Sequence, residues 1–233
     1  MKTIGLIGGM SWESTAHYYA HINRLTQQRR GGVHSAPILL YSFDFSELEA
    51  LQRKGDWATI ALRIGGAAVK LEAAGAGLIL VCANTMHIVA GEIAAGLGVP
   101  LIHIVDPAAQ AIRAAGLRKV GLLGTAYTME HSFFPDRLRN FGIEALVPEK
   151  DDRALCHRII FEELVRGIVR EDSRAAYRRV IGRLVERGAQ GIILGCTELT
   201  MIVGEGDCPV PAFDTAELHA RAAVSFALDE PAA

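Results

Sequence analysis

Two cysteines, Cys82 and Cys196, occupy similar places in the chain and are the residues best suited to carry chemistry. Cys82 follows the apolar run 77–81 and precedes Ala-Asn-Thr, while Cys196 follows 191–195 and precedes Thr-Glu. Each run predicts a buried parallel strand that ends in a polar turn, and open α/β sheets bind ligands at the carboxyl ends of such strands. A thiolate accepts a proton and a thiol donates one, so the two side chains are a candidate acid/base pair.

Two such groups on opposite sides of one carbon could remove its proton from one face and return a proton to the other face, with no cofactor. Each thiol precedes a predicted helix, and a helix amino terminus lowers the pKa of a nearby thiol. We therefore expect lowered pKa values for both cysteines. The alternative is that they are inert packing residues, as buried cysteines commonly are. That is our interpretation of Cys156, within a predicted helix, and of Cys208, which precedes Pro209.

The segments around the cysteines belong to a longer internal repeat. Gly-Leu-Ile-Gly at 5–8 is matched by Gly-Leu-Leu-Gly at 121–124, and Val-Pro at 99–100 is matched by Val-Pro at 210–211. Three matches in the same order predict two pseudo-symmetric halves, 1–116 and 117–233. The closing helix, from Thr215 onward, is a candidate to pack on the first half. We predict an α/β fold in which each half is a parallel sheet flanked by helices, with the functional site in the cleft between the halves.

Apolar periodicity predicts strands that alternate with helices, which favours parallel sheets. We expect a loop between the second strand and the helix that begins near Trp57, one helix over 85–97, and a helical region over 149–186 broken near 167–173. The strands are expected at 3–8, 37–42, the segment before Cys82, 101–104, 118–123, 143–147, the segment before Cys196, and 211–213.

Composition argues against several classes of protein, namely nucleic-acid-binding, exported and membrane-spanning proteins. The chain has 233 residues, is half hydrophobic and carries a net charge of −2, without a basic stripe, so nucleic acid is an unexpected partner. The apolar start is short and broken by glycines, unlike a signal peptide, and no run is long enough to span a membrane. Four dispersed cysteines indicate reduced thiols in a cytoplasm. The eight histidines form no metal-ligand pattern with them.

The turns after the cysteines could also hold an anion. Asn84, Thr85 and Thr197, with the neighbouring backbone amides, suit a substrate carboxylate at a helix start. Capping of the same helices explains these residue types equally well.

Three segments together resemble one family. The segments 4–15, 82–87 and 195–198 read IGLIGGMSWEST, CANTMH and GCTE. They are similar to the aspartate/glutamate racemases, which work without pyridoxal phosphate, and in particular to the branch of aspartate racemases and broad-specificity amino-acid racemases. The resemblance covers essentially the whole chain. It implies a cofactor-independent enzyme that interconverts L- and D-amino acids, with a small-molecule amino acid as its partner and a homodimer as a possible assembly.

The resemblance also implies roles for individual residues. Cys82 and Cys196 correspond to the two proton donors and acceptors. The residues that it places around the substrate are Met10, Gln52, Arg53, Asn84, Thr85, Thr197, Glu198 and Arg166. The two arginines would suit a second carboxylate on the substrate, whereas the branch also includes enzymes for neutral side chains.

Two other functions remain open at this point. A relative acting on hydantoins or on maleate could use the same cysteine pair. Two similar lobes could also form a carboxylate-binding module with no catalytic activity, which would bind an amino acid tightly without exchanging its α-proton.

Overall fold

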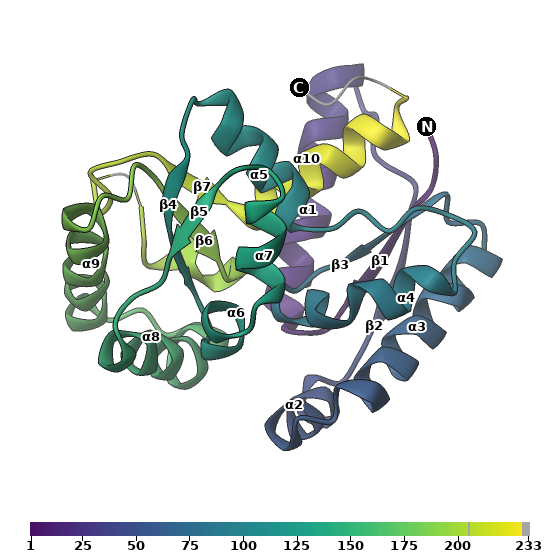
Figure 1. Ribbon diagram of the computed structural model, residues 1–233. Helices are drawn as coiled ribbons and strands as arrows, with labels where there is room; N and C mark the ends of the chain where they lie inside the picture. The colour runs from purple at the N-terminus through teal and green to yellow at the C-terminus, as the bar shows by residue number, and fades with distance from the viewer. Residues whose placement is uncertain (205, 230–233) are drawn as a thin grey trace. The chain divides into compact units, whose positions relative to one another are not determined.

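The computed structural model describes residues 1–204 and 206–229, and its chain divides into two compact units (Figure 1). The first unit is built from two separate stretches, Met1–Ile104 and His219–Ala233, and the second unit is the continuous stretch Val105–Leu218. The last helix, α10 (Thr215–Ala227), starts in the second unit and continues into the first.

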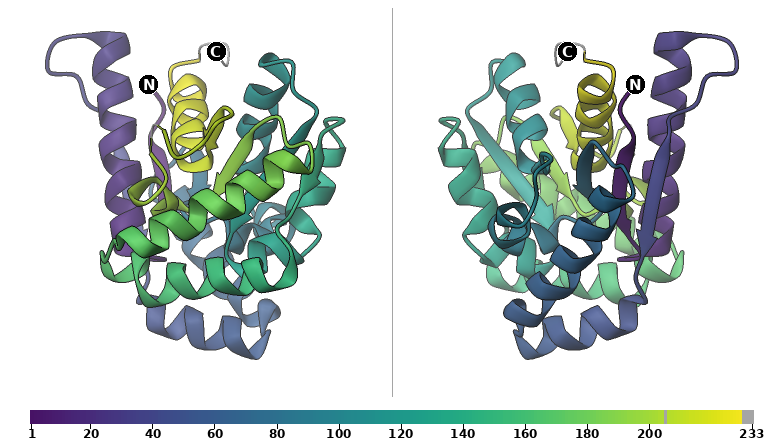
Figure 2. Two further views of the ribbon diagram at one scale, coloured as in Figure 1. Left: turned by 90° about the vertical axis from the view of Figure 1, so that its left-hand side faces the viewer. Right: turned by 90° about the vertical axis from the view of Figure 1, so that its right-hand side faces the viewer.

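The first unit contains a parallel sheet with the strand order β2-β1-β3. β1 and β3 are buried along their whole length, as expected for parallel strands covered on both faces. Both views of Figure 2 show α1 alongside β1. The elements of this unit before α10 are β1 (Ile4–Gly8), α1 (Trp12–Arg30), β2 (Ile38–Ser42), α2 (Phe45–Lys54), α3 (Trp57–Ala73), β3 (Leu78–Val81), the 3₁₀-helix η1 (Thr85–Val89) and α4 (Ala90–Ala95).

The second unit contains a parallel sheet with the order β5-β4-β6-β7. Figure 2 shows α8 and α9 packed side by side in this unit. Its elements are α5 (Val105–Ala114), β4 (Lys119–Gly124), α6 (Ala126–Glu130), α7 (Phe133–Arg139), β5 (Glu144–Leu146), α8 (Lys150–Glu162), the 3₁₀-helix η2 (Leu164–Arg166), α9 (Glu171–Glu186), β6 (Ile192–Gly195), the 3₁₀-helix η3 (Thr197–Met201) and β7 (Ala212–Asp214).

A glycine in the first strand of each sheet has the same packing role. A Cβ atom added to Gly5 would lie 2.7 Å from Cδ1 of Ile79, and one added to Gly121 would lie 2.7 Å from Cδ1 of Ile192. Each isoleucine belongs to the strand that leads to the cysteine of its own sheet. The absence of a side chain therefore lets this strand pack closely against its neighbour in both sheets. The prediction of an α/β protein with parallel sheets flanked by helices is confirmed.

Three predicted elements differ from the structure. The expected loop before Trp57 contains α2, because Asp44 caps its first turn through the amide of Ser46 and Gly55 ends it in the left-handed conformation. The single helix expected over 85–97 is divided into η1 and α4. The expected strand at 101–104 is reduced to one bridge between Ile79 and Leu101. The predicted break in the region 149–186 is present, since α8 and α9 are separate helices.

None of the helices within the described residues is long and apolar enough to span a membrane.

Candidate active site

Cys82 lies directly after β3 and is completely buried. Its amide still donates a hydrogen bond of 2.9 Å to the carbonyl of Ile7, so the cysteine extends the pairing of β3 with β1. The turn 83–84 follows, and η1 starts at Thr85. The thiol therefore lies at the carboxyl end of a strand, as the sequence predicts.

The backbone of this turn is fixed by hydrogen bonds to three successive carbonyls. Ser14 Oγ donates to the carbonyl of Cys82 at 3.1 Å. The ring nitrogen Nδ1 of His87 lies 2.9 Å from the carbonyl of Ala83, and the amide of His87 donates to the carbonyl of Asn84 at 3.0 Å. Buried carbonyls that are paired in this way restrict the turn to one conformation.

His87 belongs to a buried aromatic cluster behind the turn. Its ring packs edge-on against His103 and His219, with ring centroids 4.7 Å and 5.7 Å away. His219, in α10, hydrogen-bonds through Nε2 to the carbonyl of Ile102 and through Nδ1 to the hydroxyl of Tyr18, each at 2.8 Å. A carbonyl only accepts, so Nε2 of His219 carries the proton and Nδ1 accepts from Tyr18. Burial, followed by the nearby His87, lowers the pKa of His219 to about 3.

Cys196 lies directly after β6, at the N-cap position of η3. Its thiol donates to Oε2 of Glu198 at 3.0 Å, and the hydroxyl of Thr197 donates to the same oxygen at 2.8 Å. Glu198 is itself buried. The second turn therefore pairs a thiol with a carboxylate that can accept its proton, and the three predicted residues Cys196, Thr197 and Glu198 lie in contact.

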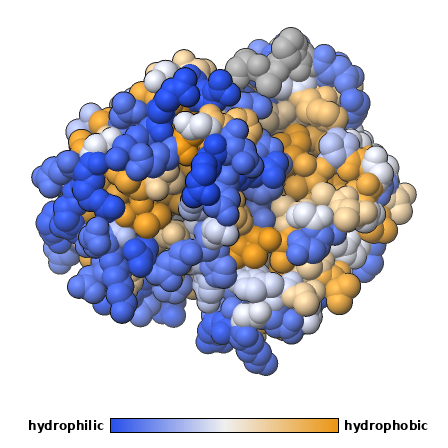
Figure 3. All heavy atoms as spheres, in the orientation of Figure 1, coloured by the Kyte–Doolittle hydropathy of each residue, from blue (hydrophilic) through white to orange (hydrophobic). Residues whose placement is uncertain are grey.

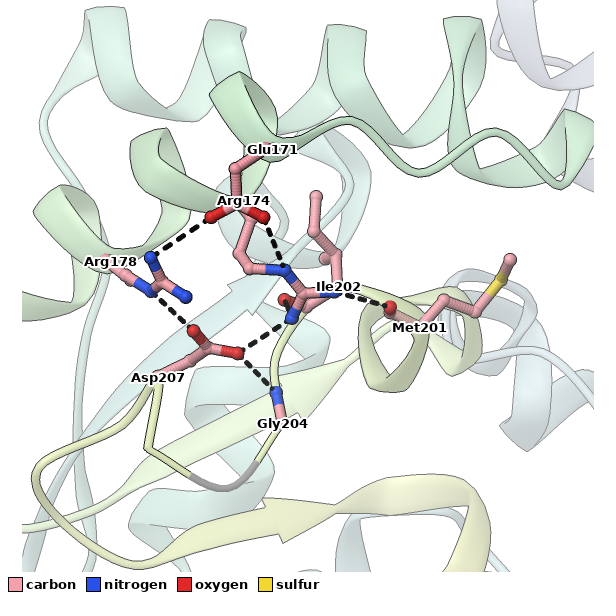
Figure 4. A network of polar contacts seen from close by, with 7 residues as sticks. All are labelled: Glu171, Arg174, Arg178, Met201, Ile202, Gly204 and Asp207. Carbon is pink, nitrogen blue, oxygen red and sulfur yellow. Dashed lines mark hydrogen bonds and ion pairs between the residues drawn. The ribbon is translucent and has the colours of Figure 1, made fainter.

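The loop after η3 is held by a buried carboxylate, Asp207, that pairs with two partly exposed arginines of α9 (Figure 4). Arg174, on α9, donates to the carbonyl of Ile202 at 2.7 Å and to Asp207 at 2.9 Å. Arg178 donates to the other oxygen of Asp207 at 2.5 Å. The amide of Gly204 and the two guanidinium groups hold the pKa of Asp207 below its usual range. Asp207 thus fixes the loop that closes the end of η3.

The electrostatics of the thiols differ from the sequence-based expectation. Burial raises the pKa of Cys82. Burial, the charge of Glu198 and the hydrogen bond to it raise the pKa of Cys196 well above its usual value. The expectation of lowered pKa values is wrong, because both thiols are removed from water and each precedes a 3₁₀-helix of five residues rather than a long α-helix. Cys156 is also buried and its pKa is raised to about 12.

The other predicted residues lie in different environments. Met10 is buried in the core of the first unit. Asn84 and Thr85 are buried in the turn after Cys82, and the side chain of Asn84 makes no capping hydrogen bond to η1. Gln52 is 3 % exposed, and its Oε1 atom has no hydrogen-bond partner among the described residues.

The two arginines expected near a second carboxylate are both exposed. The side chain of Arg53 is 68 % exposed and forms an ion pair of 3.0 Å with Glu49, one turn earlier on α2. Arg166 lies at the end of η2. In the structure neither guanidinium is enclosed.

Several residues that hold the two turns are not predicted by the sequence. Ser14 lies within a segment that carries the family resemblance, which is a usable signal for its importance, but no sequence pattern indicates its contact with Cys82. No local sequence pattern indicates the remaining supporting residues, because their hydrogen-bond partners lie far away in the sequence. These residues are His219, Tyr18, Arg174 and Asp207.

Comparison with known proteins identifies the family to which this α/β chain belongs. The sequence profile of the Asp/Glu/Hydantoin racemase family matches residues 7–223. The chain belongs to this family. Membership supports an isomerase that acts as an amino-acid racemase.

Relatives of known structure or curated description agree with this family. The broad specificity amino-acid racemase RacX of Bacillus subtilis (strain 168) is 24 % identical over 235 residues, which cover 95 % of this chain and 96 % of RacX. A Yersinia pestis crystal structure assigned to the Asp/Glu racemases shares 54 % identity, with a TM-score of 0.92 over 98 % of this chain and 100 % of that one. An aspartate racemase homologue from Pyrococcus horikoshii OT3 shares 36 % identity, with a TM-score of 0.85 and the same coverage.

Proposed function

We propose that this chain is a cofactor-independent amino-acid racemase in which Cys82 and Cys196 exchange the α-proton of one bound amino acid. One cysteine, as thiolate, removes the proton from one face of the α-carbon. The other, as thiol, protonates the opposite face, and the roles reverse for the other enantiomer. The observation that carries the proposal is the contact between the Cys196 thiol and Glu198, because it supplies a proton acceptor next to a thiol at the carboxyl end of a strand.

The raised pKa values suit this chemistry in one respect. An α-proton of an amino acid is only weakly acidic, so its removal needs a strong base. A buried thiolate is a stronger base than an exposed one, while the same burial makes the thiolate rare before the substrate binds. Glu198 can receive the proton that Cys196 loses. We infer that formation of the thiolate is coupled to substrate binding.

The turns themselves are the proposed binding site for the substrate carboxylate. Asn84 and Thr85 follow one cysteine and Thr197 follows the other, which places polar groups beside each thiol. Preorganised amides and hydroxyls at these positions would stabilise the negative charge that develops when the α-proton leaves. Met10, Gln52, Arg53 and Arg166 are the proposed residues that contact the substrate side chain.

The identity of the side chain is best tested with both acidic and neutral amino acids, because Arg53 and Arg166 are exposed. Aspartate, glutamate, homoserine and aliphatic amino acids should be assayed as pure enantiomers by chiral chromatography. Hydroxylamine, which captures pyridoxal phosphate, should leave the rate unchanged.

The mechanism is tested by proton exchange in deuterium oxide. The wild-type enzyme should place deuterium at the α-carbon of the product. Cys82→Ser and Cys196→Ser should each lower racemisation by roughly 100- to 10,000-fold, the usual contribution of an acid/base group. Each variant should still exchange the α-proton of one enantiomer with solvent, and the two variants should differ in which enantiomer this is.

Cys208→Ser is the matched control, because Cys208 is a partly buried free cysteine outside both turns. It should retain full activity. Racemisation without incorporation of deuterium would contradict the proposal. Turnover of hydantoins or maleate with no turnover of amino acids would identify a different activity, and tight amino-acid binding with no exchange would identify a binding module.

A further inference from the structure

His157 is a partly buried histidine of α8 that the proposed mechanism does not use. Hydrophilic side chains predominate on the surface over α8 and α9, at the left of Figure 3, while α8 buries Cys156, Ile159 and Ile160 on its inner side. α8 is therefore an amphipathic surface helix. It packs against α6 (Figure 1), and the ring of His157 reaches that shorter helix.

The ring of His157 accepts a hydrogen bond from the first turn of α6. The amide of Ala126 donates to Nδ1 of His157 at 3.2 Å. Ala126 is the first residue of α6, and the first amides of a helix have no partner within the helix itself. Because an amide nitrogen can only donate, Nδ1 carries a lone pair and the proton of the neutral ring is on Nε2. This hydrogen bond therefore exists only while His157 is neutral.

Two aromatic side chains fix the orientation of the imidazole. Tyr127, in α6, packs edge-on against it with ring centroids 5.8 Å apart, and Phe161, one turn later on α8, has its ring centroid 4.7 Å away. Burial lowers the pKa of His157, and the negative charge of Glu130 opposes this effect. Glu130 is itself paired with Arg153 of α8 at 2.9 Å, which reduces the effect of its charge on the ring.

The turn that His157 holds borders the turn of Cys196. β4 ends at Gly124, which pairs with Gly195 of β6, and Cys196 follows Gly195. A Cβ atom added to Gly124 would lie 3.0 Å from the carbonyl oxygen of Gly195 and 3.0 Å from Cβ of Thr128, in α6. The two strand ends and α6 are therefore in close contact. A shift of α6 would displace the backbone that carries Cys196.

We propose that His157 is a positioning residue for Cys196: the neutral imidazole holds the first turn of α6 against the end of β6, and protonation of the imidazole releases this turn. The proposal rests on the proposed racemase function, in which Cys196 transfers the α-proton. His157 acts through the backbone of α6 and not on the reacting atoms.

The first unit also uses a histidine beside its cysteine, but with the opposite response to acid. His87 donates to the carbonyl of Ala83, and a protonated imidazole can still donate to a carbonyl. His157 accepts from an amide, and a protonated imidazole cannot accept. Protonation of these two histidines therefore breaks the contact near Cys196 and leaves the one near Cys82.

The first experiment follows the backbone amide of Ala126 by NMR between about pH 8 and pH 4, a range that includes the ordinary titration of histidine. In the wild type, its resonance should move with the same midpoint as the ring signals of His157, because the bond is lost as the ring is protonated. His157→Asn places an amide oxygen where Nδ1 lies and does not titrate, so this movement should disappear. A resonance of Ala126 that ignores the titration of His157 would overturn the proposal.

The second experiment measures α-proton exchange in deuterium oxide. His157→Phe keeps an aromatic ring in place but removes the acceptor. In a Cys82→Ser background, where Cys196 acts alone, it should lower exchange by roughly 10- to 100-fold. In a Cys196→Ser background, exchange by Cys82 should change less than about twofold, because the two turns are separate. His157→Asn should restore most of the exchange in the first background.

Equal losses in the two backgrounds would overturn the proposal, because a general loss of structure would affect both cysteines. His34→Phe is the control, since His34 is an exposed histidine of the first unit, and it should change neither rate. If no protein with His157 intact exchanges an α-proton, the proposed function is wrong. The alkylation of Cys196 by iodoacetamide then decides the inference: His157→Phe should accelerate it by exposing the buried thiol, and an unchanged rate would overturn the inference.

Discussion

Nδ1 of His87 lies 2.9 Å from the carbonyl oxygen of Ala83, the residue next to Cys82. Because a carbonyl can only accept, this ring nitrogen is the donor and carries the proton. The same ring contacts His219, which hydrogen-bonds to Ile102. A residue of the last helix is therefore connected through one histidine to the turn that carries the first thiol. His87 is a positioning residue in this arrangement, since it acts on the backbone and not on the substrate.

The role of His87 can be tested by keeping or removing its donor. The amide nitrogen of asparagine can occupy the position of Nδ1, so His87→Asn should keep the hydrogen bond to Ala83 and retain most of the activity. His87→Leu removes the donor and leaves a buried carbonyl unpaired, which costs about 1–3 kcal/mol of folding stability. We expect His87→Leu to lower kcat more than it raises KM, because the proposed base is displaced while the carboxylate site partly remains. Equal activity of the two variants would contradict a positioning role.

The low pKa of His219 predicts a loss of stability in acid. In the unfolded chain this histidine takes up a proton near pH 6.5, whereas in the folded protein it stays neutral down to about pH 3. Its contribution is therefore complete above pH 6.5 and is lost as the pH falls from 6.5 toward 3. The loss amounts to at most roughly 5 kcal/mol for a shift of this size.

The matching variant is His219→Gln, whose amide nitrogen can replace Nε2 as the donor to Ile102. The groups that face His219 are the hydroxyl of Tyr18 and the ring of His87. Urea unfolding between pH 7 and pH 4 should show a steep loss of stability in the wild type and a shallower one in the variant. Identical slopes would show that another group controls the acid response.

Glu198 should control the ionisation of Cys196. Its negative charge and its hydrogen bond both raise the pKa of the thiol, so Glu198→Gln should lower that pKa. In a Cys82→Ser background, the rate at which iodoacetamide alkylates Cys196 should therefore reach its half-maximal value at a lower pH in the variant. No shift of this profile would contradict the assigned contact.

The same substitution should lower racemase activity by about 10- to 100-fold, because the acceptor for the thiol proton is lost. The equilibrium constant between two enantiomers is one, so kcat/KM must fall equally in both directions. An unequal loss would indicate a fault in the assay rather than a property of the enzyme.

Asp207 should be important for stability, because its carboxylate connects two arginines of α9 to the loop after η3. Asp207→Ala removes the acceptor of hydrogen bonds from Arg174, Arg178 and the amide of Gly204 and should cost about 1–3 kcal/mol, measured by urea unfolding. Asp136→Ala is the control, since it removes an exposed ion pair with Arg139 and should cost at most about 1 kcal/mol. Similar losses of stability in the two variants would show that the cluster around Asp207 contributes no more to stability than an exposed ion pair does.

The sequence predicts the two strand ends that carry Cys82 and Cys196, because continuous apolar runs followed by polar turns are local signals. It also identifies Glu198 and Thr197, which lie next to Cys196 in the chain. It fails where burial decides the outcome. The pKa of a thiol depends on the atoms that exclude water from it. His219 supports the Cys82 turn, but in the sequence the whole second unit lies between the two. The capping residues of α2, Asp44 and Gly55, are local signals in the sequence, yet the loop that the sequence predicts contains both.

The first unit combines Met1–Ile104 with the segment from His219 onward, and this division has a consequence for synthesis. When the first 104 residues leave the ribosome, the partner of Tyr18 and the acceptor of the Lys2 amide, the carbonyl of Ala227, have not yet been made. The second unit is continuous, whereas the first unit lacks α10 until the residues after 218 have been made. We therefore expect the turn that bears Cys82 to acquire its final support only after the whole second unit has been synthesised.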